Sequence, residues 1–400
     1  MTTADALKPI TLAQDTISQD ELQKTADWML AGNRLTKAEE TTRFEAEFSE
    51  WQGCKHSIFV NSGSSANLLM IYAAQEAGRL RNNKVIAPAV SWVTTVSPLM
   101  QFGFDVRLCD CDPVNLGLDL NHLEKLCREE APSMLILVHV LGHANHMKEI
   151  KEICARYGVL LLEDSCEALG SVAGGRKLGS HGAAGSFSFY YGHHISTIEG
   201  GMVVTDDSEL HQVMMSLRSH GWSRDLDPAR RDSLQKQHSI DDFRNLYTFY
   251  HAGFNLRSTD LQAYIGRQQV KKLDQICAIR EDNFAAYAKG LVGFYGQASE
   301  TELLSSFAYG TLVENRMEVF EHLKAQNIEC RPLICGNIAR HPFWLRKYGP
   351  QDLPNADVVH EFGIYLPNHH NLTAEDVARV SAAFNEVARP KEMPGQAAAA

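Results

Sequence analysis

A regular alternation between residues 57 and 206 is the feature that most constrains the fold. Short apolar runs rich in Val, Ile and Leu are separated by longer stretches with helical periodicity. The runs read SIFV, KVIAPAV, DVRLCD, MLILVHV, VLLLED, GSFSFYY and GGMVVTD. Strands that alternate with helices form a mainly parallel sheet, which helices cover on both faces. The sequence therefore predicts an α/β fold.

The length of the chain indicates more than one structural unit, because 400 residues exceed a single compact core. We expect an N-terminal helical segment over 1–30, a large α/β domain over 31–275, a small C-terminal α+β domain over 276–390 and a tail over 391–400. Residues 222–254 interrupt the pattern, since they are polar, charged and aromatic with no clean period. We interpret them as a long excursion near a binding site.

Charge and cysteine content limit the partners. The net charge is −11 with no block of Lys or Arg, which argues against nucleic acid or an anionic membrane. No run approaches the roughly 18 apolar residues of a membrane span, and the N-terminus lacks the pattern of a signal peptide. Nine cysteines without a CxxC pair indicate reduced thiols. We expect a cytoplasmic protein.

Several chemically suggestive residues follow predicted strands, where ligands gather in an open α/β sheet. Gly63 and Ser64, in NSGSSANLL, open a helix whose free amides suit a phosphate, although an ordinary serine cap has the same sequence. Glu163 and Asp164 end VLLLED and face opposite ways, so either one points into a site or both end a solvated strand.

Two further strand ends add to this pattern. Trp92, in PAVSWVTTV, is either a core residue or a flat face for a ring. Ser186 and Ser188, in GSFSFYY, share one face of a strand and can present their hydroxyls together. The order of phosphate loop, aromatic residue, aspartate and serine strand is more specific than any one of its parts.

At these residues the sequence resembles the family of sugar-nucleotide aminotransferases and dehydratases among the fold-type-I pyridoxal-phosphate (PLP) enzymes. The matching segments are NSGSSANLL, PAVSWVTTV, LLLEDSCEALGS, GAAGSFSFYYGHHISTIEGGMVVTD and GFNLRSTDLQAYIG. The resemblance implies a PLP-dependent transferase fold with a mainly parallel sheet flanked by helices and a smaller α+β C-terminal domain.

The resemblance also implies residues for the cofactor. Backbone groups of Gly63 and Ser64 and the Ser188 hydroxyl would hold its phosphate. Asn255, in GFNLRSTDLQA, would reach the phosphate of a neighbouring subunit's cofactor, which implies a homodimer with shared active sites. Trp92 would stack on the pyridine ring. Asp164 would pair with the protonated ring nitrogen, and Glu167 would lie near the ring's phenolic oxygen, where the family commonly has glutamine.

The sequence departs from the family at its catalytic lysine. The family has this lysine six residues before the glutamate of EGG, and six residues before Glu199 stands His193. No lysine occurs between Lys177 and Lys236. Imidazole forms no stable imine with an aldehyde, but it is a competent base near neutral pH. We expect His193 to be the catalytic base, and we expect the adjacent His194 to be structural.

The same replacement marks family members that remove the C3 hydroxyl of 4-keto-6-deoxy sugar nucleotides. The resemblance therefore implies a lyase that uses PLP and pyridoxamine phosphate (PMP), takes its amine from L-glutamate and releases ammonia. The run GHHISTIEGG resembles that of these 3-dehydratases, and the chain is most similar to the cluster-free branch acting on GDP-4-keto-6-deoxymannose, in the synthesis of colitose for lipopolysaccharide O-antigen. Another branch binds an iron–sulfur cluster through four cysteines. Cys166 matches its first ligand, but no cysteine pair follows HGWSRD, so we expect no cluster and no metal.

The sequence leaves other readings open. His220, Arg257 and Arg331 are candidate contacts for the nucleotide diphosphate or for the carboxylate of glutamate, and each is as readily a surface residue. An aminotransferase that has lost its lysine, by drift or by engineering, is one rival function. A non-catalytic ligand-binding protein with the PLP fold is another.

Overall fold

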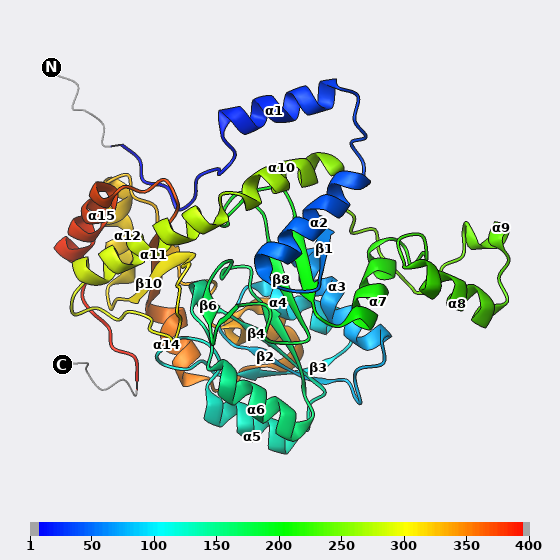
Figure 1. The fold of residues 1–400 in the computed structure, drawn as a ribbon. Helices are drawn as coiled ribbons and strands as arrows, with labels where there is room; N and C mark the ends of the chain where they lie inside the picture. The colour runs from blue at the N-terminus through cyan, green and yellow to red at the C-terminus, as the bar shows by residue number, and fades with distance from the viewer. Residues whose placement is uncertain (1–7, 395–400) are drawn as a thin grey trace.

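The structure is a computed structural model that describes residues 8–394. The predicted alternation forms a seven-stranded sheet with the strand order β1-β9-β8-β5-β4-β2-β3 (Figure 1). Its strands are β1 (His56–Val60), β2 (Lys84–Pro88), β3 (Asp105–Cys109), β4 (Met134–Val138), β5 (Leu160–Asp164), β8 (Ala184–Ser188) and β9 (Gly201–Thr205). Within this sheet β9 runs antiparallel to both neighbours and the other pairs are parallel. The predicted mainly parallel sheet is confirmed.

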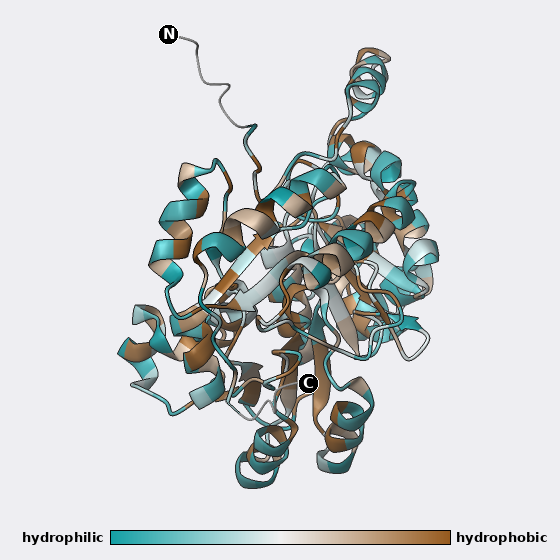
Figure 2. Cartoon of the chain, turned by 90° about the vertical axis from the view of Figure 1, so that its left-hand side faces the viewer, coloured by the Kyte–Doolittle hydropathy of each residue, from teal (hydrophilic) through white to brown (hydrophobic). Residues whose placement is uncertain are grey.

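Helices cover both faces of this sheet because neighbouring side chains on a strand point to opposite faces. In β1, Ile58 and Val60 belong to the core beneath one set of helices, while Phe59 packs in another core with Phe44 and Phe48. The first set comprises α3 (Gly63–Glu76), α4 (Val93–Gln101) and α7 (Ser208–Arg218). The opposite set comprises α2 (Glu39–Gln52), α5 (Leu120–Glu130), α6 (Met147–Tyr157) and α10 (Asp260–Val270). Figure 2 shows the apolar strands between these helices and hydrophilic residues on the outer helix faces.

A smaller sheet with its own helices follows in the chain. Its strands lie in the order β10-β12-β11 and comprise β10 (Ala308–Leu312), β11 (Arg331–Pro332) and β12 (Gly363–Pro367). Its helices are α11 (Leu273–Gly290), α12 (Arg316–Ala325) and α15 (Ala374–Val387). Short elements complete the fold: β6 (Val172–Ala173), β7 (Arg176–Lys177), η1 (Val140–Gly142), η2 (Ile338–Arg340), α13 (Pro342–Tyr348) and α14 (Pro354–Phe362).

The ends of the predicted domains can be compared with these elements. Residues 275 and 276, where we divide the large from the small domain, both lie inside α11. Met393 is buried in the main core, so the expected tail is packed at this residue. Residues 395–400 of that tail and residues 1–7 of the N-terminal segment lie outside the described residues.

Two segments lie outside the main layers. Helix α1 (Gln19–Leu30) lies along α10, and before it the chain pairs Ile10 with Ile328 of the smaller unit (Figure 1). Residues 222–254 form an arm that projects from the body and contains α8 (Pro228–His238) and α9 (Asp242–Asn245). Helix α8 escapes detection in the sequence because Leu234 is its one buried residue, and a helix polar on nearly every side shows no apolar period.

Within residues 8–394, no helix is long and apolar enough to cross a membrane. All nine cysteines are among the described residues, and each is a free thiol.

Candidate active site

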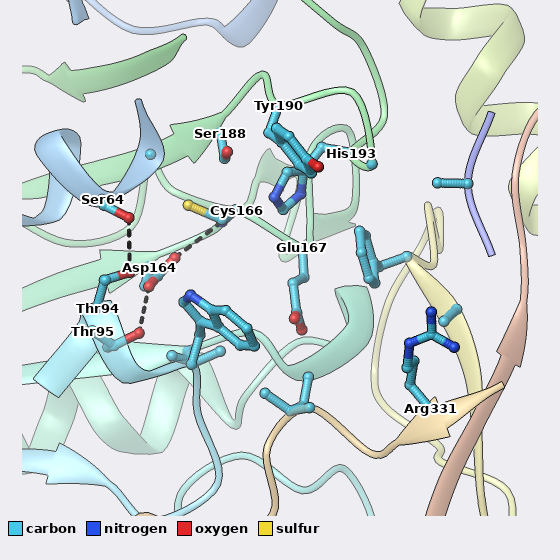
Figure 3. Close-up of a pocket in the computed structure, with 18 of the residues that line it drawn as sticks. Ser64, Thr94, Thr95, Asp164, Cys166, Glu167, Ser188, Tyr190, His193 and Arg331 are labelled. Carbon is cyan, nitrogen blue, oxygen red and sulfur yellow. Dashed lines mark hydrogen bonds between the residues drawn. The ribbon is translucent and has the colours of Figure 1, made fainter. Parts of the chain in front are cut away.

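The carboxyl ends of the parallel strands open into a cavity of about 430 Å³. The cavity brings together eight of the eleven residues selected from the sequence: Gly63, Ser64, Trp92, Asp164, Glu167, Ser188, His193 and Arg331. Figure 3 shows that the labelled side chains among them come from different strands, helices and loops and surround one space: Ser64, Asp164, Glu167, Ser188, His193 and Arg331. The alternation of strands and helices explains this convergence, since parallel strands end at the same edge of the sheet.

One end of the cavity is the N-terminus of α3. Ser62 caps this helix, and its hydroxyl accepts a hydrogen bond from the Ser65 amide at 3.1 Å. A Cβ atom on Gly63 would lie 2.5 Å from the Cβ of Ser188, so the close approach of helix and strand requires glycine. Free helix amides beside the hydroxyls of Ser64 and Ser188 form a site suited to a phosphate.

Asp164, at the end of β5, is held by three donors before any ligand binds. Its Oδ2 atom accepts hydrogen bonds from Asn67 Nδ2 and Thr95 Oγ1, both at 2.7 Å. The amide of Cys166 donates to Oδ1 at 3.2 Å. Ser186 fixes Asn67 in turn, donating to its Oδ1 at 2.6 Å. The carboxylate is therefore oriented toward the cavity as a ready partner for a cationic nitrogen.

Glu163 faces away from the cavity, as expected for the neighbour of Asp164 on a strand. It is fully buried, lies 3.0 Å from His139 Nε2 and accepts backbone hydrogen bonds from residues 179, 181 and 182. Burial acts to raise the pKa of Glu163, but His139 and the amide donors outweigh burial and lower the pKa. Glu163 thus ties a loop to the sheet and is separate from the site.

Glu167 also lies on the cavity wall. Its Oε2 accepts a hydrogen bond from the Leu141 amide at 2.8 Å. Burial raises the pKa of Glu167 to about 8, and the nearby charge of Asp164 acts in the same direction. At pH 7 the side chain is mostly a neutral carboxylic acid, which can donate a hydrogen bond as an amide can.

The two adjacent histidines have different surroundings. His193 lines the cavity beside Phe307, with ring centroids 5.2 Å apart, and its buried Nδ1 has no hydrogen-bond partner among the described residues. Burial lowers the pKa of His193 to about 4, so the ring is neutral at pH 7. His194 is buried outside the cavity lining, with Nε2 2.9 Å from the Ser305 carbonyl oxygen. His193 alone of the pair faces the space where a ligand would bind.

Three predicted site residues lie outside the cavity of their own chain: His220, Asn255 and Arg257. They contact one another at the start and end of the arm. Arg257 Nε donates to Asn255 Oδ1 at 3.0 Å, and an Arg257 terminal nitrogen lies 3.2 Å from His220 Nε2. No residue of 222–254 lines the cavity of its own chain either, and the expected place of this segment near a binding site stays a prediction.

The structure adds residues that the sequence did not reveal. Asn67 and Thr95 hold Asp164, and both lie within the first turns of helices that begin at Gly63 and Val93. That position, one turn after a strand-end residue, is the signal that could have identified them. Tyr190 and Tyr191 also line the cavity and directly follow β8, so the same strand-end signal applies to them. Other wall residues come from distant segments for which the sequence has no comparable signal: Leu12, Ala13, Phe307 and Tyr365.

The groups that line the cavity can be compared with the parts of PLP that they would contact. Helix amides and serine hydroxyls match a phosphate, and an oriented buried carboxylate matches a protonated ring nitrogen. Trp92 borders the cavity with 56% of its surface exposed, so its indole is available to a ring. No lysine occurs among the described residues that line the cavity. In residues 8–394, no three His, Cys, Asp or Glu side chains gather in a way that could hold a metal.

This fold is that of the fold-type-I PLP-dependent transferases, and the cavity at its strand ends is lined by His193 and by no lysine of the described residues. The chain belongs to the DegT/DnrJ/EryC1/StrS aminotransferase family, which it matches over residues 16–385.

Individual proteins similar to this chain include 3-dehydratases of a GDP-linked sugar. The chain is 33% identical over 379 residues to GDP-4-keto-6-deoxy-D-mannose 3-dehydratase of Yersinia pseudotuberculosis, covering 92% of this chain and 95% of the relative. A crystal structure of GDP-4-keto-6-deoxymannose 3-dehydratase with bound GDP-perosamine superposes with a TM-score of 0.87 at 29% identity, over 94% of this chain and all of that one. The Escherichia coli enzyme with bound hydrated PLP has a TM-score of 0.86 at 28% identity, over 94% and 99% of the two chains.

Proposed function

We propose that this protein is a PLP- and PMP-dependent 3-dehydratase of a 4-keto-6-deoxy sugar nucleotide, with GDP-4-keto-6-deoxymannose as substrate and L-glutamate as amino donor. The observation that carries the proposal is His193, a neutral imidazole on the cavity wall where an aminotransferase has its lysine. The similarity to 3-dehydratases over most of the chain supports the choice of reaction.

Each polar residue of the cavity has a separate role in the proposed reaction. When bound, PMP supplies the amine that condenses with the C4 ketone and a ring that accepts electrons. Asp164 keeps the ring nitrogen protonated, and Glu167 donates a hydrogen bond to the phenolic oxygen. His193 would be the base for a proton on the cofactor's methylene carbon and could return that proton to the C3 hydroxyl, which would leave as water. The sugar would then leave the cofactor as an enamine, which tautomerises to an imine; hydrolysis of this imine in water gives ammonia and the 3-deoxy-4-keto sugar.

Arg331 provides a cation for the anionic parts of the reactants. Its guanidinium lies on the cavity wall, forms no ion pair with the described residues, and donates to the backbone carbonyl of Cys330 at 2.9 Å. Four further N–H donors are therefore available to a carboxylate or a diphosphate. We assign Arg331 to the carboxylate of glutamate in the first half-reaction and to the substrate's diphosphate in the second.

The active protein in this proposal is a homodimer with shared sites. Support comes from the separation of Asn255, His220 and Arg257 from their own cavity and from their mutual hydrogen bonds at the surface. In a two-fold dimer each chain presents the same patch to its partner, so these groups would complete the partner's phosphate and nucleotide contacts.

The mass of the product tests the proposal. The protein is incubated with PLP, L-glutamate and GDP-4-keto-6-deoxymannose, and the sugar nucleotide and ammonia are measured. Loss of the C3 oxygen with release of ammonia is the expected result. A 4-amino sugar would show that transamination persists without the lysine and would overturn the proposal. Absence of any product, with PLP bound and glutamate unchanged, would favour a non-catalytic binding protein.

A further inference from the structure

Arg280, in α11, is a buried cation close to the proposed base. Its side chain is almost fully buried, with 1% of its surface exposed, and it forms no ion pair within residues 8–394. Its guanidinium donates instead to backbone carbonyls: to Ser306 at 3.2 Å, Phe307 at 3.0 Å and His193 at 3.3 Å, and also to Asn368. Its Nε atom has no partner among the described residues.

A comparison with Arg218 shows how unusual this environment is. Arg218 is also fully buried, but it pairs with Glu45 and lies 3.7 Å from Asp225. A buried charge without a counter-charge loses its hydration, and carbonyl dipoles compensate for this loss only in part. Burial accordingly lowers the pKa of Arg280 to about 10, and the side chain remains charged at pH 7. A costly unpaired charge beside a proposed active site calls for a functional reason.

Arg280 contacts both the backbone of His193 and the residue that packs against the His193 ring. One terminal nitrogen holds the carbonyl of His193 itself, and the other holds the carbonyl of Phe307, whose ring packs against the imidazole. Phe307 and Ala308 lead into β10 and line the cavity. The guanidinium therefore fixes the loop that carries the imidazole relative to the strand that packs against it.

The electrostatic setting of His193 is made by groups from several elements. On its own loop stands His194, and the same buried guanidinium faces both rings. From β5 and the turn after it, Asp164 and the Cys166 carbonyl act to raise the pKa of His193, whereas burial and Arg280 lower it to about 4. The other titratable side chains on the cavity wall are Cys166, Glu167, Tyr190, Tyr191, Glu329, Arg331 and Tyr365.

We propose that Arg280 is a positioning residue for His193: its guanidinium fixes the backbone of the loop that carries the imidazole and holds a positive charge beside the ring. The catalytic part of this inference rests on the proposed function. The structural part concerns the chain alone and applies to any activity of this cavity.

The test is the titration of His193 itself, followed by NMR in the full-length chain labelled at histidine. Substitution His193→Asn identifies the resonance. In Arg280→Met the pKa of His193 should rise by about one unit, because the imidazolium no longer faces a like charge. In Arg280→Lys the charge remains and the pKa should stay close to that of the wild type. Arg316→Met is the matched control, since Arg316 also donates to two backbone carbonyls, those of His360 and Gly363, away from His193.

Two results would overturn the proposal. One is an unchanged pKa of His193 in folded Arg280→Met, as judged by circular dichroism and thermal unfolding. If Arg280→Met does not fold, Arg280→Lys decides through turnover: a single ammonium cannot reach all four carbonyls, so kcat should fall roughly 10- to 100-fold with KM little changed. Wild-type kcat in Arg280→Lys would overturn the positioning role. Because the titration needs no substrate, its outcome is independent of which sugar the enzyme accepts.

Discussion

The cavity and the base of the arm both contain polar side chains held by hydrogen bonds, but those of the cavity lie inside the chain and those of the arm lie at its surface. In the cavity, Asp164 is buried and held by three hydrogen bonds, and His193 is half-buried. At the base of the arm, Asn255 and Arg257 are hydrogen-bonded to each other beside a group of partly exposed aromatic rings, with Trp222 stacked on Phe249. The cavity is thus organised within one chain for chemistry, whereas the arm presents binding groups outward. We infer that the protein separates the reacting groups from the groups that need a second chain.

The largest effect should follow from His193→Asn, which removes the proposed base and nothing else in the cavity wall. Turnover should fall by about 10²–10⁴-fold, the usual contribution of a general base, while binding of PLP is retained. Stopped assays of ammonia and the absorbance of bound cofactor measure the two quantities. The control is His194→Asn on the same loop, whose ring contacts the Ser305 carbonyl instead of the cavity. Equal losses in the two variants would contradict the assignment.

Glu167→Gln tests whether the cavity holds a neutral acid. The folded pKa of Glu167 is raised to about 8 from an ordinary 4.5, so the folded chain holds a proton that the unfolded chain loses. The stabilisation is present below pH 4.5 and is lost as the pH rises through about 8. Glutamine does not titrate, so Glu167→Gln should not share the wild type's loss of stability at high pH. Between pH 5 and pH 9 the unfolding free energy of the variant should therefore rise relative to that of the wild type, on the order of a few kcal/mol.

Thermal unfolding at several pH values measures this difference. A constant difference between wild type and Glu167→Gln across that range would show that Glu167 is already ionised in the folded chain. In the activity assay, Glu167→Gln should also remove any loss of turnover above pH 8 that arises from ionisation of this group.

Asn255→Ala tests whether the arm serves another chain. The variant should bind PLP more weakly, by roughly tenfold, as expected for one lost hydrogen bond to a charged group. At a PLP concentration that loads the wild type but leaves Asn255→Ala largely unloaded, mixing this variant with His193→Asn should restore activity, because one cavity of the mixed dimer keeps His193 and receives Asn255 from its partner. In a one-to-one mixture, roughly a quarter of all sites become intact.

The control for mixing pairs His193→Asn with Asp164→Asn. Both residues line the same cavity, so neither cavity of that mixed dimer is intact and no activity should return. Recovery in the control would show that His193 and Asp164 reach one site from different chains. Absence of recovery in the mixture with Asn255→Ala would place Asn255 in its own chain's site.

The same contrast explains what the sequence could predict. Gly63, Asp164 and Ser188 were predictable because each ends or follows a strand, and parallel strands end together. Leu12 and Phe307 were not, because they reach the cavity from segments far away in the chain, through packing that no local pattern encodes. Glu163 and Asp164 show the limit of prediction from the sequence. The alternation of side chains along a strand indicated that the two point to opposite faces, but only the fold shows that Asp164 is the one that enters the site.

The smallest effect is expected at the tip of the arm. Phe243, in α9, has 84% of its surface exposed, while Phe187, in β8, is fully buried. Phe187→Ala should cost about 3–5 kcal/mol of unfolding free energy, and Phe243→Ala about 0.5 kcal/mol or less if the tip stays in water. Denaturant unfolding of the two variants at several protein concentrations measures both values. A large, concentration-dependent loss in Phe243→Ala would show that a second chain buries the tip, which would extend the shared surface from the base of the arm to its end.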